Sequence, residues 1–461
     1  MKRNIIAQAV GLMAAMTTVA TAQEETQPPL KLTGVETQGA HVVDVATGEV
    51  IYDYLSGHRL TPASTTKLFT TAMALLELGP DHRIRTDIGV DRQTAEVIVH
   101  GRFDPTTDSQ YFNRNQLSQE ADTIAAKLKT LGMQRIKLTG DVSLGLFSPY
   151  CSKRLWEDMG NYYGAAPTCL TADDNMVTVY FHSPEEDNAA CDIDSVVPTV
   201  GELKPVSYVR TYAGNADRCN IYMAGEDLWY ATGCIPKGKG SFAVKATMPS
   251  AEKHYIDKLA DMLRARGVDV TATAIETERR ERRDSIIGAI YSPRIAEIAA
   301  AVNQRSVNLF ADGLMMTMSA KWSHATWSGA TEKVKEYWNK RLGFKLTIYD
   351  GSGLSPMGAI SPSEMTSLLT YMWRSKASKT FRETLATMGR TGTLRNMGAG
   401  SRLAGRVWAK SGSMAGVLAY SGYAKDKNGR MLAFSIIVNH HQESTANMRN
   451  EVVRWLEKIV E

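Results

Sequence analysis

The sequence predicts an α+β fold in which an antiparallel sheet, covered by helices, is built from both ends of the chain and interrupted by a large, mostly β insertion. Strand patterns lie near both termini, helical periodicity lies between them, and short strands with turns fill the centre. The chain has 461 residues, of which 43% are hydrophobic and 22% charged. This is ordinary globular composition in a chain too long for one hydrophobic core, so we expect two or three domains.

The N-terminal elements are a hairpin and a buried helix. Between His41 and Tyr54, two β-branched runs flank Ala46-Thr47-Gly48-Glu49, which is typical of a β-hairpin. Pro62 can occupy the first turn of the following helix, and Gly79-Pro80 ends it. The helix is apolar enough between these limits to be a central core helix.

From about Arg83 the pattern changes to short strands, such as 96–99, 136–138 and 176–181. A helix from Ser250 to Arg266 and a charged linker at 278–283 close this stretch. We expect residues 83–284 to form an inserted domain of one or two subdomains. The chain then returns to a discontinuous first domain, made of residues 23–82 and 285–461.

The C-terminal part begins with helical periodicity after Ser292-Pro293 and ends in strands. The strands Val417 to Ala424 and Met431 to Asn439 flank Asn428-Gly429, the strongest two-residue hairpin signal. A final helix is expected over residues 446–460. These strands complete the sheet that the N-terminal hairpin begins.

The first residues have the three parts of a secretory signal: Lys2-Arg3, an apolar run from Ile5 to Val19, and small residues ending at Ala22. We expect residues 1–22 to be a signal peptide, cleaved after Ala22, and the mature protein to be exported to the periplasm. No later segment reaches the roughly 18 apolar residues of a membrane-spanning helix, so no transmembrane segment is expected after cleavage.

Charge and cysteine content exclude some partners. The net charge is only +4, and basic and acidic residues are interspersed, so no nucleic-acid partner is expected.

An oxidising compartment would permit one or two disulfides among the centrally placed cysteines, although their pairing cannot be read from the sequence. Their spacings match no zinc pattern. These cysteines are Cys151, Cys169, Cys191, Cys219 and Cys234.

The first candidate catalytic pair is Ser64 and Lys67, in Ser64-Thr65-Thr66-Lys67. Residues three apart lie on one face of a helix, so the amine can act as base for the hydroxyl. Ser250 and Lys253 have the same spacing. We interpret Ser250 as a helix N-cap and Lys253 as a surface residue, because their helix is amphipathic rather than buried.

Two further motifs carry hydroxyl, amide and amine side chains that could take part in catalysis or bind a substrate. Ser306 and Asn308 lie in a turn between two helices, although either residue could instead cap the second helix. Lys410 and Ser411 could bind a carboxylate at the start of a strand, and Gly412, followed by Ser413, would let a ligand approach the backbone. The alternative for Lys410 is a solvated lysine on an edge strand.

The order Ser-x-x-Lys, Ser-x-Asn, Lys-Ser-Gly is the motif set of penicillin-binding proteins and serine β-lactamases. The chain resembles the D-alanyl-D-alanine carboxypeptidase/endopeptidase family, the low-molecular-mass class with a large insert after the first motif. Further segments that look like this family are Gly140-Asp141, Tyr162-Tyr163-Gly164-Ala165, Tyr349-Asp350-Gly351-Ser352-Gly353-Leu354-Ser355 and Gly392-Thr393-Leu394-Arg395. The resemblance implies a penicillin-binding-protein/serine β-lactamase-like transpeptidase fold, with residues 23–82 and 285–461 as its catalytic domain.

The resemblance implies that Ser64 forms an acyl-enzyme, that Lys67, Ser306 and Asn308 are catalytic, and that residues 410–413 bind substrate. Peptidoglycan stem peptides, ending in D-Ala-D-Ala or cross-linked through D-Ala, would be the substrates and β-lactams the inhibitors. No metal or organic cofactor is required. The chain departs from the family's pattern at Ser411, where Thr is usual, and at Arg102-Phe103-Asp104-Pro105-Thr106, which often begins with Gly.

Two alternatives use the same motifs. A serine β-lactamase would have a much shorter gap between Ser64 and Ser306, and a non-catalytic peptidoglycan-binding protein would have a degraded site. The long gap and the complete set of side chains favour the carboxypeptidase or endopeptidase. Sequence does not separate these two activities, because both cut a bond after D-Ala.

Overall fold

The structure is a computed structural model that describes residues 27–145, 148–201, 203–225, 227–279, 281, 283–320 and 325–461. The expected signal peptide, residues 1–22, lies outside this part of the chain. Within it, no helix combines the length and the apolar character needed to cross a membrane.

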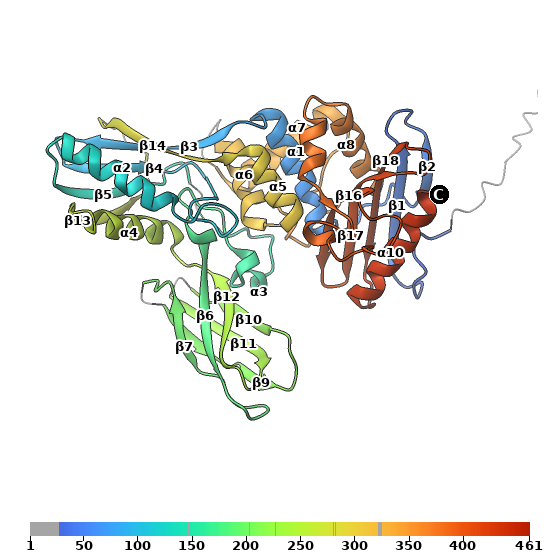
Figure 1. Ribbon diagram of the computed structural model, residues 1–461, viewed down its shortest axis with the longest axis horizontal. Helices are drawn as coiled ribbons and strands as arrows, with labels where there is room; N and C mark the ends of the chain where they lie inside the picture. The colour runs from blue at the N-terminus through green and yellow to red at the C-terminus, as the bar shows by residue number, and fades with distance from the viewer. Residues whose placement is uncertain are drawn as a thin grey trace, which may run out of the picture.

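One antiparallel sheet of six strands combines the two ends of the chain, as predicted (Figure 1). Its strand order is β15-β16-β17-β18-β1-β2, and β1 pairs with β18 along its whole length. Both predicted hairpins are present, β1–β2 and β17–β18. The strands are β1 (Thr37–Asp44), β2 (Val50–Tyr54), β15 (Ala386–Thr387), β16 (Val407–Met414), β17 (Val417–Lys425) and β18 (Met431–Asn439).

Helices cover both faces of this sheet. The C-terminal helix α10 (Thr445–Ile459) packs Trp455 edge-on against Phe434 of β18 on one face. On the other face, α8 (Pro362–Arg374) lies against β18, β1 and β17. Alternate residues of β18 therefore enter two different hydrophobic cores, which is why the central strands read as continuous apolar runs.

The helical layer beside the sheet is centred on α1, which a 3₁₀ turn at Ala63–Thr66 precedes. Residues 67–75 of α1 are all buried, as its apolar sequence predicts. The indole Nε1 of Trp338 donates to the carbonyl of Phe69, with their rings edge to face. The helices of this layer are α1 (Lys67–Glu77), α5 (Ile295–Arg305), α6 (Asn308–Ala320), α7 (Trp327–Leu342) and α9 (Ser378–Thr384).

The central stretch first forms a five-stranded mixed sheet, at the opposite end of the molecule from α10 (Figure 1). Its order is β13-β5-β4-β3-β14, with parallel pairing of β5 to both β4 and β13. Helices α2 and α4 accompany it, and α2 was not predicted. The elements are β3 (Arg83–Asp91), β4 (Glu96–His100), α2 (Gln116–Thr130), β5 (Arg135–Asp141), α4 (Ala251–Arg264), β13 (Asp269–Glu276) and β14 (Ser285–Arg294).

Helix α4 confirms one expectation and corrects another. Lys253 lies on its exposed face and pairs with Asp257. Ser250 does occupy the N-cap position, but its φ of 49° is left-handed and its side chain makes no capping hydrogen bond. The predicted cap interaction is therefore wrong, because a left-handed residue does not have the extended backbone of an N-cap.

The rest of the central stretch is a small all-β unit of two sheets, β12-β6-β7 and β10-β11-β8, with β9 also pairing to β11. Apolar residues of both sheets share one core around Trp229 and Phe181. A short helix, α3 (Trp156–Met159), contacts β10. The strands are β6 (Met176–Ser183), β7 (Ile193–Val197), β8 (Lys204–Ser207), β9 (Arg210–Tyr212), β10 (Arg218–Met223), β11 (Leu228–Pro236) and β12 (Gly240–Thr247).

All five cysteines are free in the structure, so the expected one or two disulfides are not formed. Cys169 packs in the main core, and the thiol of Cys151 lies 3.5 Å from the carbonyl of Tyr349. The other three lie in the small β unit, where Cys191 and Cys219 pack in the core and Cys234 is on β11 beside Cys219.

Replacement of Trp338 tests the helical layer. We expect Trp338→Ala to lower the free energy of unfolding by about 3–5 kcal/mol, because it leaves a cavity against α1. Trp338→Phe, which keeps a ring beside Phe69, should cost much less. Urea unfolding measures both values, and equal losses for the two variants would contradict this packing role.

Candidate active site

The first motif forms a close serine–lysine pair at the start of α1. Ser64 lies in the 3₁₀ turn, half-buried, and Lys67 is the first residue of the helix and fully buried. The Nζ of Lys67 is 2.8 Å from the Oγ of Ser64, which is a hydrogen-bond distance. The structure therefore brings this predicted pair into direct contact.

Lys67 has two other polar partners. Its Nζ donates to the Oδ1 of Asn308 at 2.5 Å and to the carbonyl of Ser352 at 2.7 Å. Burial lowers the pKa of Lys67 to about 7, against the opposing effect of the Asp312 and Asp350 carboxylates. The lowered pKa favours the neutral amine, which has a lone pair that can accept a proton.

The second motif enters from the turn between α5 and α6. Ser306 ends α5 with a left-handed φ of 62°, and Asn308 begins α6. The Oγ of Ser306 accepts a hydrogen bond from Lys410 at 2.9 Å. The amide of Asn308, besides its contact with Lys67, donates to the carbonyl of Tyr163 at 2.8 Å. Both side chains therefore face the two lysines.

The third motif lies on β16, just beyond the two residues that pair with β15, so among the described strands residues 410–413 pair only with β17. Lys410 is completely buried, which excludes a solvated edge lysine. Burial, and secondarily the charge of Lys67, hold the pKa of Lys410 well below its ordinary value. The hydroxyl of Ser411 donates to that of Thr393 at 2.8 Å, in the segment Gly392-Thr393-Leu394-Arg395.

Gly412 permits a close approach, but of the chain itself rather than of a ligand. A Cβ at this position would lie 2.6 Å from the carbonyl oxygen of Pro62 and 3.0 Å from the amide nitrogen of Ser64. The turn that carries Ser64 therefore rests directly on β16. The next residue, Ser413, is exposed beside this contact.

Several residues of the site were not assigned roles from the sequence. Ser352, Tyr163 and Thr393 lie within the segments that carry the family resemblance, so a signal for them existed. Asp312 is the single charged residue of the otherwise apolar helix α6, which is also a signal. Arg154, which pairs with Asp312, has no distinguishing local pattern.

Comparison with known proteins places this site in a family. A family model described as D-Ala-D-Ala carboxypeptidase 3 (S13) matches residues 23–459. The D-alanyl-D-alanine carboxypeptidase of Actinomadura sp. (strain R39) is 28% identical over 439 residues, which cover 87% of this chain and 78% of that protein. DacB of Haemophilus influenzae, also a D-alanyl-D-alanine carboxypeptidase, is 22% identical over 426 residues, which cover 89% of this chain and 86% of that protein.

A solved structure has the same fold. The crystal structure of penicillin binding protein 4 (dacB) from Haemophilus influenzae matches with a TM-score of 0.78 at 20% identity, over 94% of this chain and 98% of that one. The predicted penicillin-binding-protein fold with a β-rich addition is thereby confirmed. Because one family model spans residues 23–459, nearly the whole chain, this protein belongs to the D-Ala-D-Ala carboxypeptidase 3 (S13) family of serine peptidases.

Proposed function

We propose that this carboxypeptidase cuts the terminal D-Ala from peptidoglycan stem peptides through an acyl-enzyme on Ser64. The observation that carries the proposal is the contact of the Ser64 hydroxyl with a fully buried lysine whose pKa is about 7. A serine hydroxyl needs a base to become a nucleophile, and a neutral amine at hydrogen-bond distance is such a base.

In the first step, Ser64 Oγ attacks the carbonyl carbon of the penultimate D-Ala, and its proton passes to Nζ of Lys67. A neutral Lys67 has two N–H donors and one lone pair. The contacts to Asn308 and Ser352 match the two donors, which leaves the lone pair directed at Ser64. The surroundings of Lys67 therefore favour the proton transfer that acylation requires.

In the second step, the bond between the carbonyl carbon and the leaving nitrogen breaks, and the leaving amine takes up a proton. We assign the delivery of this proton to Ser306, together with Lys67, and the orientation of the substrate amide to Asn308. Water then hydrolyses the ester, which frees Ser64 and the shortened peptide. The same steps would cut a cross-link if the leaving amine belonged to a second stem peptide.

Substrate binding is assigned to residues 410–413. Lys410 and the hydroxyl of Ser411 would hold the terminal carboxylate, with Thr393 beside them. A carboxylate next to Lys410 would raise the pKa of its amine again, because an opposite charge stabilises the ammonium form. The backbone N–H groups of Ser64 and Ser413 would stabilise the oxyanion, and losing one such donor typically costs about 3–4 kcal/mol.

We infer that the protein is exported to the periplasm after cleavage at Ala22 and that β-lactams acylate Ser64. A structure of the Haemophilus influenzae penicillin binding protein 4 in complex with a β-lactam has a TM-score of 0.76 to this chain, and it supports the second inference. The family match favours the carboxypeptidase over the β-lactamase and over the non-catalytic binding protein.

The proposed domain division follows the sheets. The six-stranded sheet and its helices would form the catalytic domain, and the central stretch an insertion of two subdomains, one around the five-stranded sheet and one all-β. We had expected the insertion to end at residue 284. Because β14 (Ser285–Arg294) pairs with β3 throughout, we propose a boundary after Arg294 instead.

The nucleophile can be tested by intact-mass spectrometry after exposure of the mature protein to a penicillin. We expect a lasting adduct on the wild type and none on Ser64→Ala. Ser250→Ala is the matched control, since Ser250 has the same spacing to a lysine and should leave labelling unchanged. A labelled Ser64→Ala variant would refute the assignment, and rapid loss of the adduct with drug hydrolysis would favour a β-lactamase.

The pH dependence of acylation tests the role of Lys67. Because the neutral amine is the active form, the second-order acylation rate constant should rise about tenfold per pH unit below 7 and level off above it. Stopped-flow or gel-based labelling between pH 5 and pH 9 measures this profile. A rate that does not change across pH 7 would rule out Lys67 as the titrating base.

The contact between Gly412 and the Ser64 turn gives a further test. Gly412→Ala places a methyl group against Pro62 and the amide of Ser64, so it should displace the turn and slow acylation at least about tenfold. Gly400→Ala is the control, because a Cβ there meets nothing within 4 Å. Equal acylation rates of the two variants would show that the close approach is not needed.

A further inference from the structure

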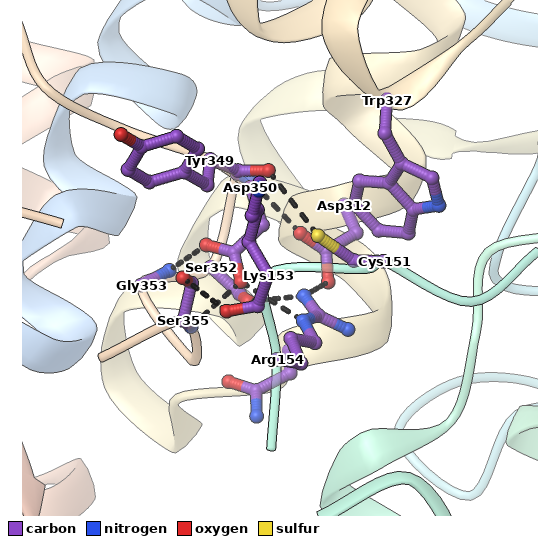
Figure 2. A network of polar contacts seen from close by, with 12 residues as sticks. Cys151, Lys153, Arg154, Asp312, Trp327, Tyr349, Asp350, Ser352, Gly353 and Ser355 are labelled. Atoms are coloured by element: carbon purple, nitrogen blue, oxygen red, sulfur yellow. Dashed lines mark hydrogen bonds and ion pairs between the residues drawn. The ribbon is translucent and has the colours of Figure 1, made fainter. Parts of the chain in front are cut away.

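Arg154, from the central stretch, is buried in a network of polar contacts with Asp312 and Asp350 (Figure 2). Its Nη2 donates to Asp312 at 2.5 Å and its Nε donates to Asp350 at 2.9 Å. The side chains of all three residues are at most 2% exposed. Such a buried cation requires close partners, and the two carboxylates provide them.

The carboxylates also organise the turn at residues 350–353. Asp312 Oδ1 accepts from the amide of Gly351 at 2.9 Å, and Asp350 Oδ1 accepts from that of Gly353 at 2.6 Å. Arg154 binds the turn directly as well, because its Nη2 donates to the hydroxyl of Ser352 at 2.9 Å. One guanidinium therefore holds the turn through three oxygen atoms.

This turn contacts Lys67 and the 3₁₀ turn that carries Ser64. Its Ser352 carbonyl accepts from Nζ of Lys67 at 2.7 Å. Gly353, at a φ of 71°, approaches the Ser64 turn so closely that a Cβ would lie 2.0 Å from the carbonyl oxygen of Ala63. Any movement of the 350–353 turn would thus be transmitted to Ser64 and Lys67.

The segment around Arg154 is itself fixed against the same part of the catalytic layer. The carbonyl of Lys153 accepts from the hydroxyl of Ser355 at 2.6 Å, and the guanidinium lies over the ring of Trp327, 5.0 Å from its centroid (Figure 2). Arg154 is therefore pre-positioned by its neighbours, and little side-chain freedom is lost in holding the turn.

We propose that Arg154 is a positioning residue for acylation: it holds the 350–353 turn in the place from which the Ser352 carbonyl orients the amine of Lys67 toward Ser64. The inference rests on the proposed role of Ser64 and Lys67. Arg154 touches neither the proposed nucleophile nor the substrate-binding residues on β16, so its loss should slow the chemical step and leave substrate binding intact.

Charge is a second route by which this cluster acts on Lys67. The charged groups that act on its amine are Asp312 from α6, Asp350 from the turn and Arg154 from the central stretch, whereas Lys410 from β16 is a nearby amine whose own pKa Lys67 lowers. The two carboxylates favour the ammonium form of Lys67, and Arg154 opposes it. Removal of the Asp312 charge alone should therefore lower the pKa of Lys67 and extend acylation to lower pH.

The test separates penicillin binding from acylation by measuring the reversible binding constant and the first-order acylation rate constant. For Arg154→Met we expect the acylation rate constant to fall on the order of 100-fold, which is the loss typical of a reacting group misplaced by about 1 Å. The binding constant should stay within about twofold of wild type.

Arg154→Lys keeps the charge but not the planar guanidinium. Its acylation rate constant should fall less, and the variant should remain folded. Asp312→Asn should move the acid limb of the rate profile to lower pH.

Arg266→Met is the control, because it removes an arginine of the same central stretch whose ion pair with Asp122 is exposed. It should acylate like the wild type. If Arg154→Met and Arg154→Lys acylate at the wild-type rate, or if rate and binding fall together with the folded fraction, the positioning role is refuted. Failure of the wild type to acylate at Ser64 would instead refute the proposed function.

Discussion

The burial of the Lys67 amine is the constraint on which the rest of the site depends. A lysine removed from water is stable only if its amine has acceptors within reach and its charge is either compensated or lost. Asn308 and the Ser352 carbonyl supply the acceptors, and the Ser64 hydroxyl makes the third polar contact, so that three separate segments of the chain meet at the amine. The position of α1 relative to α6 and the 350–353 turn is thereby fixed, because a displacement of any of them would leave a buried polar group without its partner.

Lys410 is a second buried lysine in the same site, and its charge and that of Lys67 must both be considered. The charge of Lys67 lowers the pKa of Lys410, while Asp312 and Asp350 oppose the lowering of the pKa of Lys67. Arg154 pairs with both carboxylates and so limits the negative charge that Lys67 experiences. Burial therefore lowers the pKa of Lys67 to about 7, which suits its proposed role as a base.

The sequence predicts the elements that neighbouring residues determine, but not the pairings between distant segments. The terminal hairpins and the buried helix at residues 67–77 follow from periodicity and turn residues. The motif order predicted Ser64, Lys67, Ser306, Asn308 and residues 410–413 as the site, and their catalytic and binding roles stay a prediction. The parallel pairing of β5 with β4 and β13 joins separate segments and has no local signature. The pairing of Arg154 with Asp312 spans 158 positions, so neither residue's partner could be named before the fold was known.

The same long-range pairing links the central stretch to the chemistry. If the central stretch were an independent domain, its contacts with the helical layer would be exposed surface contacts that tolerate substitution. Arg154 instead reaches a site where two carboxylates are at most 1% exposed, so its removal would take away the ion-pair partner that both share in a dry environment. If Arg154 has the proposed positioning role, the six-stranded sheet and its helices do not contain a complete acylation centre, and the central stretch completes it.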